Sequence, residues 1–448
     1  MASVRRNKAV ALLAAASIAS LGLAACGGTA DKADKPADKA GTEKKEEKKS
    51  EPITIEYLHR LPDGDGMVKV AEIVKRWNDE HPDIQVKATK FDGKADEMFT
   101  KLEADVKAGT APCLAQLGYG EVPTAFVKGM VEDVTAEAEK YKANFSNAYG
   151  QMTVGGSVVG LPQDTGPLVY YYDEAEFKAL GIEVPKTLDE LKAAAKKSAS
   201  QGKYILAFEP DEAGYWLSAQ GASLGEPWYT AKDGKWKVNT VNRGSEVVAS
   251  FWQEMIDGKS ALVVGRWAPE YEAALKEKKL IANIGPAWEA GFFLDAVVPE
   301  GKEGTWKVAL LPDFGEGVKT GPDGGSGVAV LKGCGHVAEA MEFNNWFNTQ
   351  NNDLASQGLV IAAKGDVTTP EKAKRQFGGQ EVYKVLSESN DTLNADFGYI
   401  PGYAAVAKQM NAKATEVAEG KAKVIDIFKV AQDESVKVLK DLKLPVSE

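Results

Sequence analysis

The apolar and polar residues change their period within one short stretch, residues 53–86. Residues 53–58 alternate apolar and polar side chains, which predicts a strand with one buried face. Between Met67 and Trp77 the apolar side chains recur every three or four residues, which predicts an amphipathic helix. Pro82 cannot continue that helix, so we expect the chain to enter a second strand at Ile84. The stretch therefore predicts a strand–helix–strand unit with a parallel sheet behind it.

The same periodicities predict alternating strands and helices along the rest of the chain. Strands are expected at residues 113–117, 158–162, 168–173, 204–208, 281–285, 306–312 and 328–331. Helices are expected at residues 96–107, 174–180, 187–200, 215–224, 246–257, 271–278 and 337–347, and again over 381–442 with a break at 394–402. Thr187 and Glu190 have the spacing of a capping box, and residues 291–293 are expected to begin a further helix.

The segment W-N-x-x-H-P-D-I-x-V at residues 77–86 closely resembles the first unit of the family 1 extracellular solute-binding proteins of ABC importers, which include the maltose-binding proteins. The resemblance extends along nearly the whole chain after residue 52. It implies an α/β, two-lobed fold of type II, in which each lobe holds a mixed, mostly parallel sheet flanked by helices. It also implies a ligand cleft at the hinge, two chain crossings near Gln163 and Gly324, and no catalysis.

The resemblance also suggests where one lobe ends and the other begins. The amino-terminal lobe is expected to contain residues 53–162 and 323–375, and the carboxyl-terminal lobe residues 163–322 and 376–448. Gly166 and Pro167 are turn-forming residues at the first crossing, so we expect a hinge there. About 396 residues follow Pro52, which is more than one hydrophobic core usually serves, and this agrees with two lobes.

The first 52 residues read as an export signal and a tether. Three cations, Arg5, Arg6 and Lys8, precede an apolar run at residues 9–23 that is too short to span a bilayer comfortably. The following Leu-Ala-Ala-Cys resembles a bacterial lipobox, which implies that residues 1–25 are removed and that Cys26 is lipidated; a chance cysteine near an ordinary cleavage site is the alternative. Residues 27–52 hold seven lysines and seven acidic residues without a side chain that could seed a core, so they are expected to form a flexible linker.

Charge and cysteine content narrow the possible partners. The formal net charge is −11, and removal of the three signal cations leaves −14, so nucleic acid is not expected as a partner. With Cys26 assigned to lipid, Cys113 and Cys334 remain as an even pair in an oxidising compartment. In the resembled family the strands next to these two cysteines are antiparallel neighbours, which implies a disulfide between them; two free buried thiols are the alternative.

No catalytic, cofactor or metal signature stands out in the sequence. The chain has no G-x-S-x-G, no Walker A, no H-E-x-x-H and no C-x-x-C motif. Gly118-Tyr-Gly120 is not a dinucleotide fingerprint because Pro123 occupies the third glycine position. Three histidines do not favour a His-rich metal site. We therefore expect no catalytic residue, no cofactor and no metal.

A sugar has hydroxyls around its rim and an apolar C–H face, so its binding site needs aromatic rings and charged or amide groups. The loops that follow predicted strands offer both, and loops at the carboxyl ends of strands are where ligands bind in open α/β sheets. The expected stacking residues are Trp216 and Trp288, with Tyr119, Tyr215 and Phe397 as second choices, and the expected rim residues are His59, Arg60, Glu121, Asp164, Glu209 and Asp396. A core position remains the alternative for each tryptophan, and a solvated surface position for each charge.

The sequence therefore favours a lipid-anchored, monomeric oligosaccharide-binding protein on the outer face of the bacterial cytoplasmic membrane, which delivers its ligand to an ABC importer permease. One alternative is an extracellular glycoside hydrolase in which Glu209 and Asp396 flank the scissile bond. Another is a binding protein for a peptide, a polyamine or iron, although Tyr170, Tyr171 and Tyr172 are consecutive in a strand and cannot all face one ion. The sequence leaves the identity, linkage and length of the sugar open.

Overall fold

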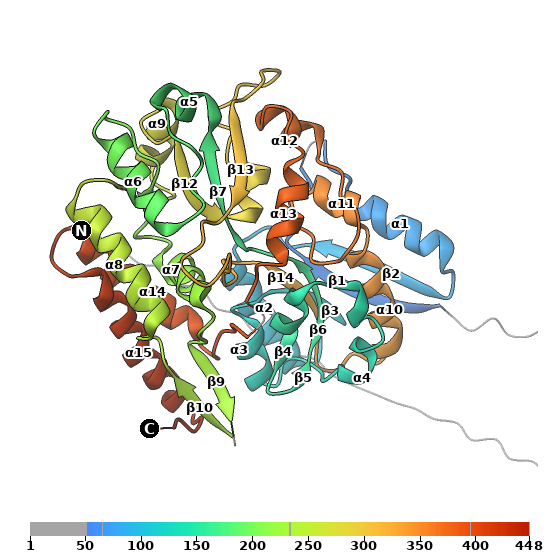
Figure 1. Cartoon of the computed structure of the whole chain (residues 1–448). Coiled ribbons are helices and arrows are strands. Elements are labelled where there is room, and N and C mark those ends of the chain that lie inside the picture. Colours follow the sequence, from blue (N-terminus) through green and yellow to red (C-terminus); the bar gives the residue numbers. More distant parts are fainter. Residues whose placement is uncertain (1–51, 65, 233, 395, 448) are drawn as a thin grey trace, which may run out of the picture. The chain divides into compact units, whose positions relative to one another are not determined.

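The amino-terminal lobe is built on a mixed five-stranded sheet. A computed structural model describes residues 52–64, 66–232, 234–394 and 396–447. The sheet has the order β2-β1-β3-β14-β6, with β1 at Ile53–His59, β2 at Ile84–Lys90, β3 at Leu114–Gly118, β6 at Gly160–Asp164 and β14 at Ser326–Val330 (Figure 1). Strand β1 pairs in parallel with β2 and β3, whereas β14 is antiparallel to β3 and β6.

The predicted strand–helix–strand unit is confirmed. Helix α1 (Val70–Glu80) follows β1 and precedes β2, and these two strands pair in parallel. The apolar stripe of the helix, which includes Ile73 and Trp77, is buried. The helix ends at His81, whose ring stacks on that of Trp77 with 3.6 Å between the centroids. Helix α2 (Ala95–Ala108) follows and ends at Gly109 in the left-handed conformation. The remaining elements of this part of the chain are α3 (Val122–Val127), α4 (Thr135–Ala138), β4 (Thr153–Val154), β5 (Ser157–Val158), α10 (Val337–Asn348) and α11 (Asn351–Ser356), with 3-10 helices η1 (Lys142–Asn144) and η2 (Asn147–Met152).

The carboxyl-terminal lobe also contains a mixed sheet. Strand β7 (Leu168–Asp173) lies between β12 (Ala282–Pro286) and β13 (Trp306–Leu310) and is antiparallel to both. A parallel bridge between Tyr204 and Leu280 connects β12 to the segment that leads into β8 (Ala207–Phe208), which pairs in parallel with β11 (Leu262–Val263). Strand β7 therefore runs against the other strands of its sheet, as β14 does in the first lobe. This arrangement confirms the expected fold class.

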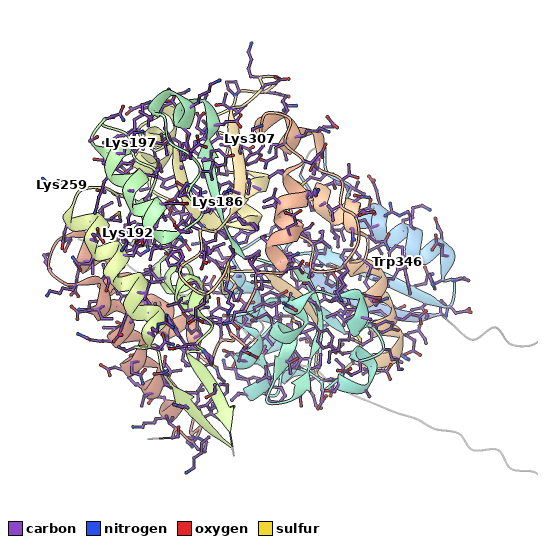
Figure 2. All side chains as sticks on the ribbon, in the orientation of Figure 1. Lys186, Lys192, Lys197, Lys259, Lys307 and Trp346 are labelled. Atoms are coloured by element: carbon purple, nitrogen blue, oxygen red, sulfur yellow. A yellow bond between two sulfur atoms is a disulfide. The ribbon has the colours of Figure 1, made fainter. Side chains whose placement is uncertain are left out.

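Helices cover the carboxyl-terminal sheet. In α6 (Leu188–Ala199), Leu191 and Ala195 are buried while Lys197 lies on the outer face, and Thr187 caps the helix by accepting the Glu190 backbone N–H at 3.3 Å (Figure 2). The other helices are α5 (Glu174–Leu180), α7 (Ala213–Gly221), α8 (Arg243–Asp257), α9 (Pro269–Lys276), α12 (Glu371–Gln376), α13 (Val382–Asn390), α14 (Tyr403–Ala418) and α15 (Val424–Asp441), with 3-10 helices η3 (Ala222–Leu224) and η4 (Ala287–Gly291). Among the described helices, none combines the length and apolar character needed to cross a membrane.

Two local predictions are wrong. The chain after Gly291 does not form the expected helix: a 3-10 helix ends there, and Phe293 turns into the core while Phe292 stays 38 % exposed. The sequence analysis also missed the hairpin of β9 (Tyr229–Lys232) and β10 (Lys235–Val238), which pairs through Trp236 with Val446 near the carboxyl end. The expected helix fails for a physical reason: Phe292 points outward and Phe293 inward, and two neighbouring rings with opposite environments do not require a helix.

The chain crosses between the sheets through closely packed backbone. Gly166 lies against the carbonyl of Asp323, where a Cβ atom would come within 2.1 Å of the oxygen, so this position requires glycine. The Asp323 N–H donates to the Gly166 carbonyl at 2.7 Å, and Pro167 is bridged to Pro322. These contacts hold the two crossings side by side. The lobe boundaries at 162/163, 322/323 and 375/376 stay a prediction.

The predicted disulfide between Cys113 and Cys334 is confirmed, with 4.6 Å between the Cα atoms. Cys113 directly precedes β3, and Cys334 follows the end of the antiparallel strand β14. The bridge therefore lies at the edge of the sheet opposite the carboxyl ends of β1 and β3. The predicted signal, Cys26 and most of the linker lie outside the described residues.

Candidate ligand cleft

The amino-terminal wall of the cleft lies at the carboxyl ends of β1 and β3. The Arg60 backbone N–H donates to Gln116 Oε1 at 2.7 Å, and Gln116 Nε2 donates to Ser326 Oγ at 2.9 Å. The Ser326 hydroxyl in turn donates to the Asp164 carboxylate. Glu121 lies beside Arg60, with 3.6 Å between its carboxylate and the guanidinium, and both side chains are partly exposed. One hydrogen-bonded chain therefore fixes the base of the polar wall.

The loops after β11 and β12 carry a row of three aromatic rings, which we take as the second wall of the candidate cleft. Trp267 follows β11, and Phe292 and Trp288 belong to the loop after β12. The rings of Trp267 and Phe292 are stacked with 6.3 Å between centroids, and those of Phe292 and Trp288 are 5.8 Å apart. Trp267 is 57 % exposed, which is unusual for so large an apolar side chain. An exposed aromatic row of this kind marks a surface that a ligand can cover.

A buried ionic network holds the aromatic row from behind. Arg266 Nε donates to Glu289 Oε1 at 2.7 Å, and the guanidinium lies 4.8 Å from the Trp267 ring centroid. Asp211 accepts the backbone N–H groups of Arg266 and Trp267 at 2.7 and 3.1 Å. The Trp267 indole N–H donates to Glu212. Both the backbone and the ring of Trp267 are thus fixed before any ligand binds.

Two carboxyl groups beside this wall, those of Glu212 and Asp323, have raised pKa values. Burial raises the pKa of Glu212 to about 7. Burial and the charges of Glu212 and Glu289 raise the pKa of Asp323 well above its usual value. The Asp323 carboxyl group accepts no hydrogen bond from the residues that the structure describes.

Tyr215 is the point where the two walls meet. A Cβ atom at Gly120 would approach the Tyr215 hydroxyl to 3.0 Å, so the two lobes touch there. Glu121 from the amino-terminal lobe, Glu212 from the carboxyl-terminal lobe and Asp323 at the crossing between them are close enough to add to the effect of burial on the Tyr215 pKa, which is raised. A second interlobe contact lies nearby, where the Gly402 N–H donates to Thr124 Oγ1 at 2.9 Å.

Residues 64–352 match the family model described as bacterial extracellular solute-binding protein, which is more than half of the chain. The chain belongs to this solute-binding family. A solved structure is similar over 89 % of this chain and 100 % of its own: the galacto-N-biose-/lacto-N-biose I-binding protein of an ABC transporter from Bifidobacterium longum, in complex with lacto-N-biose, with 50 % identity and a TM-score of 0.82.

Two curated relatives in the solute-binding family are more distant. The arabinooligosaccharide-binding protein of Bacillus subtilis is 27 % identical over 72 % of this chain and 78 % of its own length. The maltooligosaccharide ABC transporter solute-binding lipoprotein of Streptococcus pneumoniae is 28 % identical over 72 % of both chains. The resemblance inferred from residues 77–86 is thus confirmed at the level of the family.

Two of the expected ligand residues of this solute-binding protein are enclosed by the fold. His59 is 2 % exposed, its Nδ1 accepts the Leu61 N–H at 3.3 Å, and burial lowers its pKa to about 4. Trp216 is 0 % exposed, donates its indole N–H to the Ile284 carbonyl at 3.0 Å and packs on Trp252. This corrects the expectation for both residues, because core packing and internal hydrogen bonds already occupy their side chains.

Three other expected ligand residues, Glu209, Tyr119 and Asp164, are buried beneath the surface of the candidate cleft. Glu209 is buried and accepts a hydrogen bond from Asn283 Nδ2 at 2.7 Å, and burial raises its pKa well above the usual value. Tyr119 is buried and donates its hydroxyl to the Asp164 carbonyl at 2.7 Å. Asp164 is also buried, which raises its pKa to about 6. The ligand roles of Arg60, Glu121, Tyr215 and Trp288, at or beside the partly exposed surface, stay predictions.

The last two expected residues, Asp396 and Phe397, line a different cavity of about 790 Å³. Glu209 is not part of its lining, so the carboxylate pair of the hydrolase alternative does not share this space. Sequence reasoning missed Trp267, Phe292 and Asp323. A signal for Trp267 was present, because the tryptophan directly precedes a helix start at Ala268-Pro269, but β11 is too short to show an alternating pattern.

Proposed function

We propose that this protein captures an uncharged oligosaccharide between its two lobes and delivers it to the permease of an ABC importer. The observation that carries the proposal is the row formed by the exposed rings of Trp267 and Phe292 and the half-buried ring of Trp288. The row lies beside the Asp323 carboxyl group, to which no described residue donates a hydrogen bond. Aromatic rings match the C–H face of a sugar, and carboxylates accept hydrogen bonds from its hydroxyls. An acid-rich wall whose arginine is already bound to Glu289 disfavours an anionic ligand.

The relatives support a sugar ligand. The Bifidobacterium longum protein was solved with lacto-N-biose, and at 50 % identity it is the relative whose ligand we extend to this chain. The names of the Bacillus subtilis and Streptococcus pneumoniae relatives also refer to oligosaccharides. We therefore choose lacto-N-biose and galacto-N-biose as the first ligands to test.

The proposed mechanism is closure of the lobes, here taken as residues 53–162 with 323–375 and residues 163–322 with 376–448. Arg60 and Glu121 would bind the ligand from one lobe, and Trp267, Phe292 and Trp288 from the other. A ligand that contacts both walls favours the closed arrangement by its difference in affinity for the closed and open arrangements. The permease would then recognise the closed form. No group on this chain is proposed to break a glycosidic bond.

Isothermal titration calorimetry of the protein with lacto-N-biose, galacto-N-biose, β-1,6-galactobiose, maltotriose and an arabino-oligosaccharide tests the proposal. We expect one-site binding of at least one of these sugars and unchanged sugar when the mixture is analysed by chromatography after incubation. Absence of binding to every sugar in the panel would overturn the ligand assignment. Release of a shorter sugar would instead favour the hydrolase alternative.

We further propose that the chain is a monomer anchored to the outer face of the cytoplasmic membrane through lipid on Cys26. The short apolar run at residues 9–23 and the small residues before Cys26 support export and lipidation. Stable anchoring needs two acyl chains or an equivalent second signal. Replacing Cys26 with serine should move the protein from the membrane fraction to the medium, and retention of the variant in the membrane would contradict the anchor.

A further inference from the structure

A second cavity lies between the lobes, separate from the proposed cleft. Its volume is about 790 Å³, within the usual range of small-molecule sites. One side is formed by the segment around η2, including Tyr149 and Gln151, and the other by the β9–β10 hairpin and the loop before α14, including Trp236 and Phe397. Gln151 Nε2 donates to the Phe397 carbonyl at 2.6 Å, so the two sides are in direct contact at one point.

The lining of this cavity has the chemistry of a sugar site. Aromatic rings come from both sides, with Tyr149 on one and Tyr229, Trp236 and Phe397 on the other. The charged residues of the lining carry both signs, so the cavity does not call for a charged ligand; they are Lys142, Lys364, Glu139, Asp391 and Asp396. The mixture of flat rings with amide and hydroxyl groups suits an uncharged, hydroxyl-rich ring.

One polar atom in the lining points independently to a missing partner. Tyr149 is 7 % exposed, and its hydroxyl is buried without a hydrogen-bond partner among the described residues. A buried hydroxyl that makes no hydrogen bond is costly, and native structures contain few of them. Because the hydroxyl itself has almost no accessible surface, a ligand hydroxyl or carbonyl in the cavity would supply the bond once the Tyr149 side chain turns toward it.

A thin partition separates the second cavity from the cleft. Of three consecutive residues, Tyr119 lines the cavity, Gly120 touches Tyr215, and Glu121 belongs to the cleft wall. On the other lobe Tyr399 lines the cavity and packs its ring 5.6 Å from that of Tyr215. A molecule in the second cavity and a molecule in the cleft would therefore both lie next to the interlobe contact made by Tyr215.

We propose that the cavity lined by Tyr149, Gln151, Trp236 and Phe397 is a second binding site, which takes one uncharged saccharide unit. The walls of this site belong to both lobes. Its occupant therefore stabilises the arrangement of the lobes in which the Gln151–Phe397 and Thr124–Gly402 hydrogen bonds are formed. A cleft ligand that favours the same arrangement is then bound more tightly, and the coupling is reciprocal. The existence of this site is independent of the proposed function of the cleft, whereas the coupling rests on it.

The test uses the full-length protein and monosaccharide probes. The protein is first saturated with lacto-N-biose and then titrated with N-acetylglucosamine and with galactose, so that the cleft cannot account for a second binding event. We expect at least one probe to bind, and saturation with it to tighten lacto-N-biose by about fivefold or more. Tyr149→Phe removes only the unpartnered hydroxyl and should weaken the probe about fivefold without lowering the melting temperature.

Two further variants separate the second site from the cleft. Trp236→Ala should abolish binding of the probe. Its dissociation constant for lacto-N-biose should stay within twofold of the wild-type value measured without probe. Trp267→Ala should weaken binding of lacto-N-biose and leave binding of the probe unchanged. Tyr141→Phe is the matched control for Tyr149→Phe, because Tyr141 is not part of the cavity lining. Probe binding that disappears in Trp267→Ala but survives in Trp236→Ala would overturn the proposal, as would the absence of a second event with either probe. If lacto-N-biose fails to bind but probe binding still depends on Trp236, the second site stands and the proposed cleft ligand falls.

Discussion

Trp267→Ala should weaken sugar binding strongly while changing the stability of the protein little. The side chain is 57 % exposed, and a tryptophan offers up to about 250 Å², so about 140 Å² of it faces solvent. A sugar ring that covers about half of this area removes about 70 Å² from water, worth about 1.8 kcal/mol. We therefore expect lacto-N-biose, or whichever sugar the calorimetric panel identifies, to bind about 20-fold more weakly to the variant.

Calorimetry on three variants measures this effect and separates it from a general loss of structure. Trp267→Phe keeps a ring in the row and should recover most of the affinity. Trp346→Ala is the control, because this tryptophan is on α10 of the other lobe, where it packs on Trp77 and not on the aromatic row (Figure 2). A dissociation constant for Trp267→Ala within twofold of the wild type, with a folded variant, would refute the reasoning that this row is the stacking surface.

Three further predictions concern stability. Replacing Cys113 and Cys334 with serine releases a bridge that spans 221 residues, which in the chain-entropy model costs up to about 5 kcal/mol; denaturant unfolding should show the loss, while sugar affinity should not change. Arg266→Met should destabilise the protein by about 3–5 kcal/mol because Glu289 stays buried without its cation, and adding Glu289→Met should recover part of the loss in calorimetric unfolding. Burial raises the folded-state pKa of Glu212 from its usual value to about 7, so its contribution to stability is present below about pH 4.5 and is lost as the pH rises through about 7. The difference in melting temperature between wild type and Glu212→Gln should therefore change over that range. A constant difference would contradict the raised pKa.

The sequence predicted those parts of the fold in which local periodicity and tertiary burial agree. The unit β1–α1–β2 and the helices α5 and α6 have clear periods and recognisable ends, such as the Thr187 cap, and they appear within a few residues of their expected positions. The hairpin β9–β10 was missed although its Asp-Gly pair at residues 233–234 is a strong hairpin signal between alternating runs. The expected helix after Gly291 failed because two neighbouring phenylalanines have opposite environments.

The candidate site was less accessible to sequence reasoning than the fold. Arg60, Glu121 and Trp288 do follow the carboxyl ends of β1, β3 and β12, as the sequence predicted, and their ligand roles stay predictions. The same rule could not separate Trp288 from Trp216. The burial of Trp216 depends on Trp252, which belongs to α8 and is distant in sequence, and no local pattern encodes that contact.

The network behind the aromatic row is better explained by ligand binding than by stability. A buried arginine–glutamate pair is often no more stable than apolar residues of the same volume, so stability alone does not explain why Arg266 and Glu289 are charged. What they do provide is position: Arg266 lies against the Trp267 ring, and Asp211 binds the backbone of both residues. A ring that is already fixed loses little conformational entropy when a ligand covers it, which leaves more of the contact energy for affinity. Exposed aromatic surface over a buried ionic support is therefore what a preformed sugar-binding wall requires.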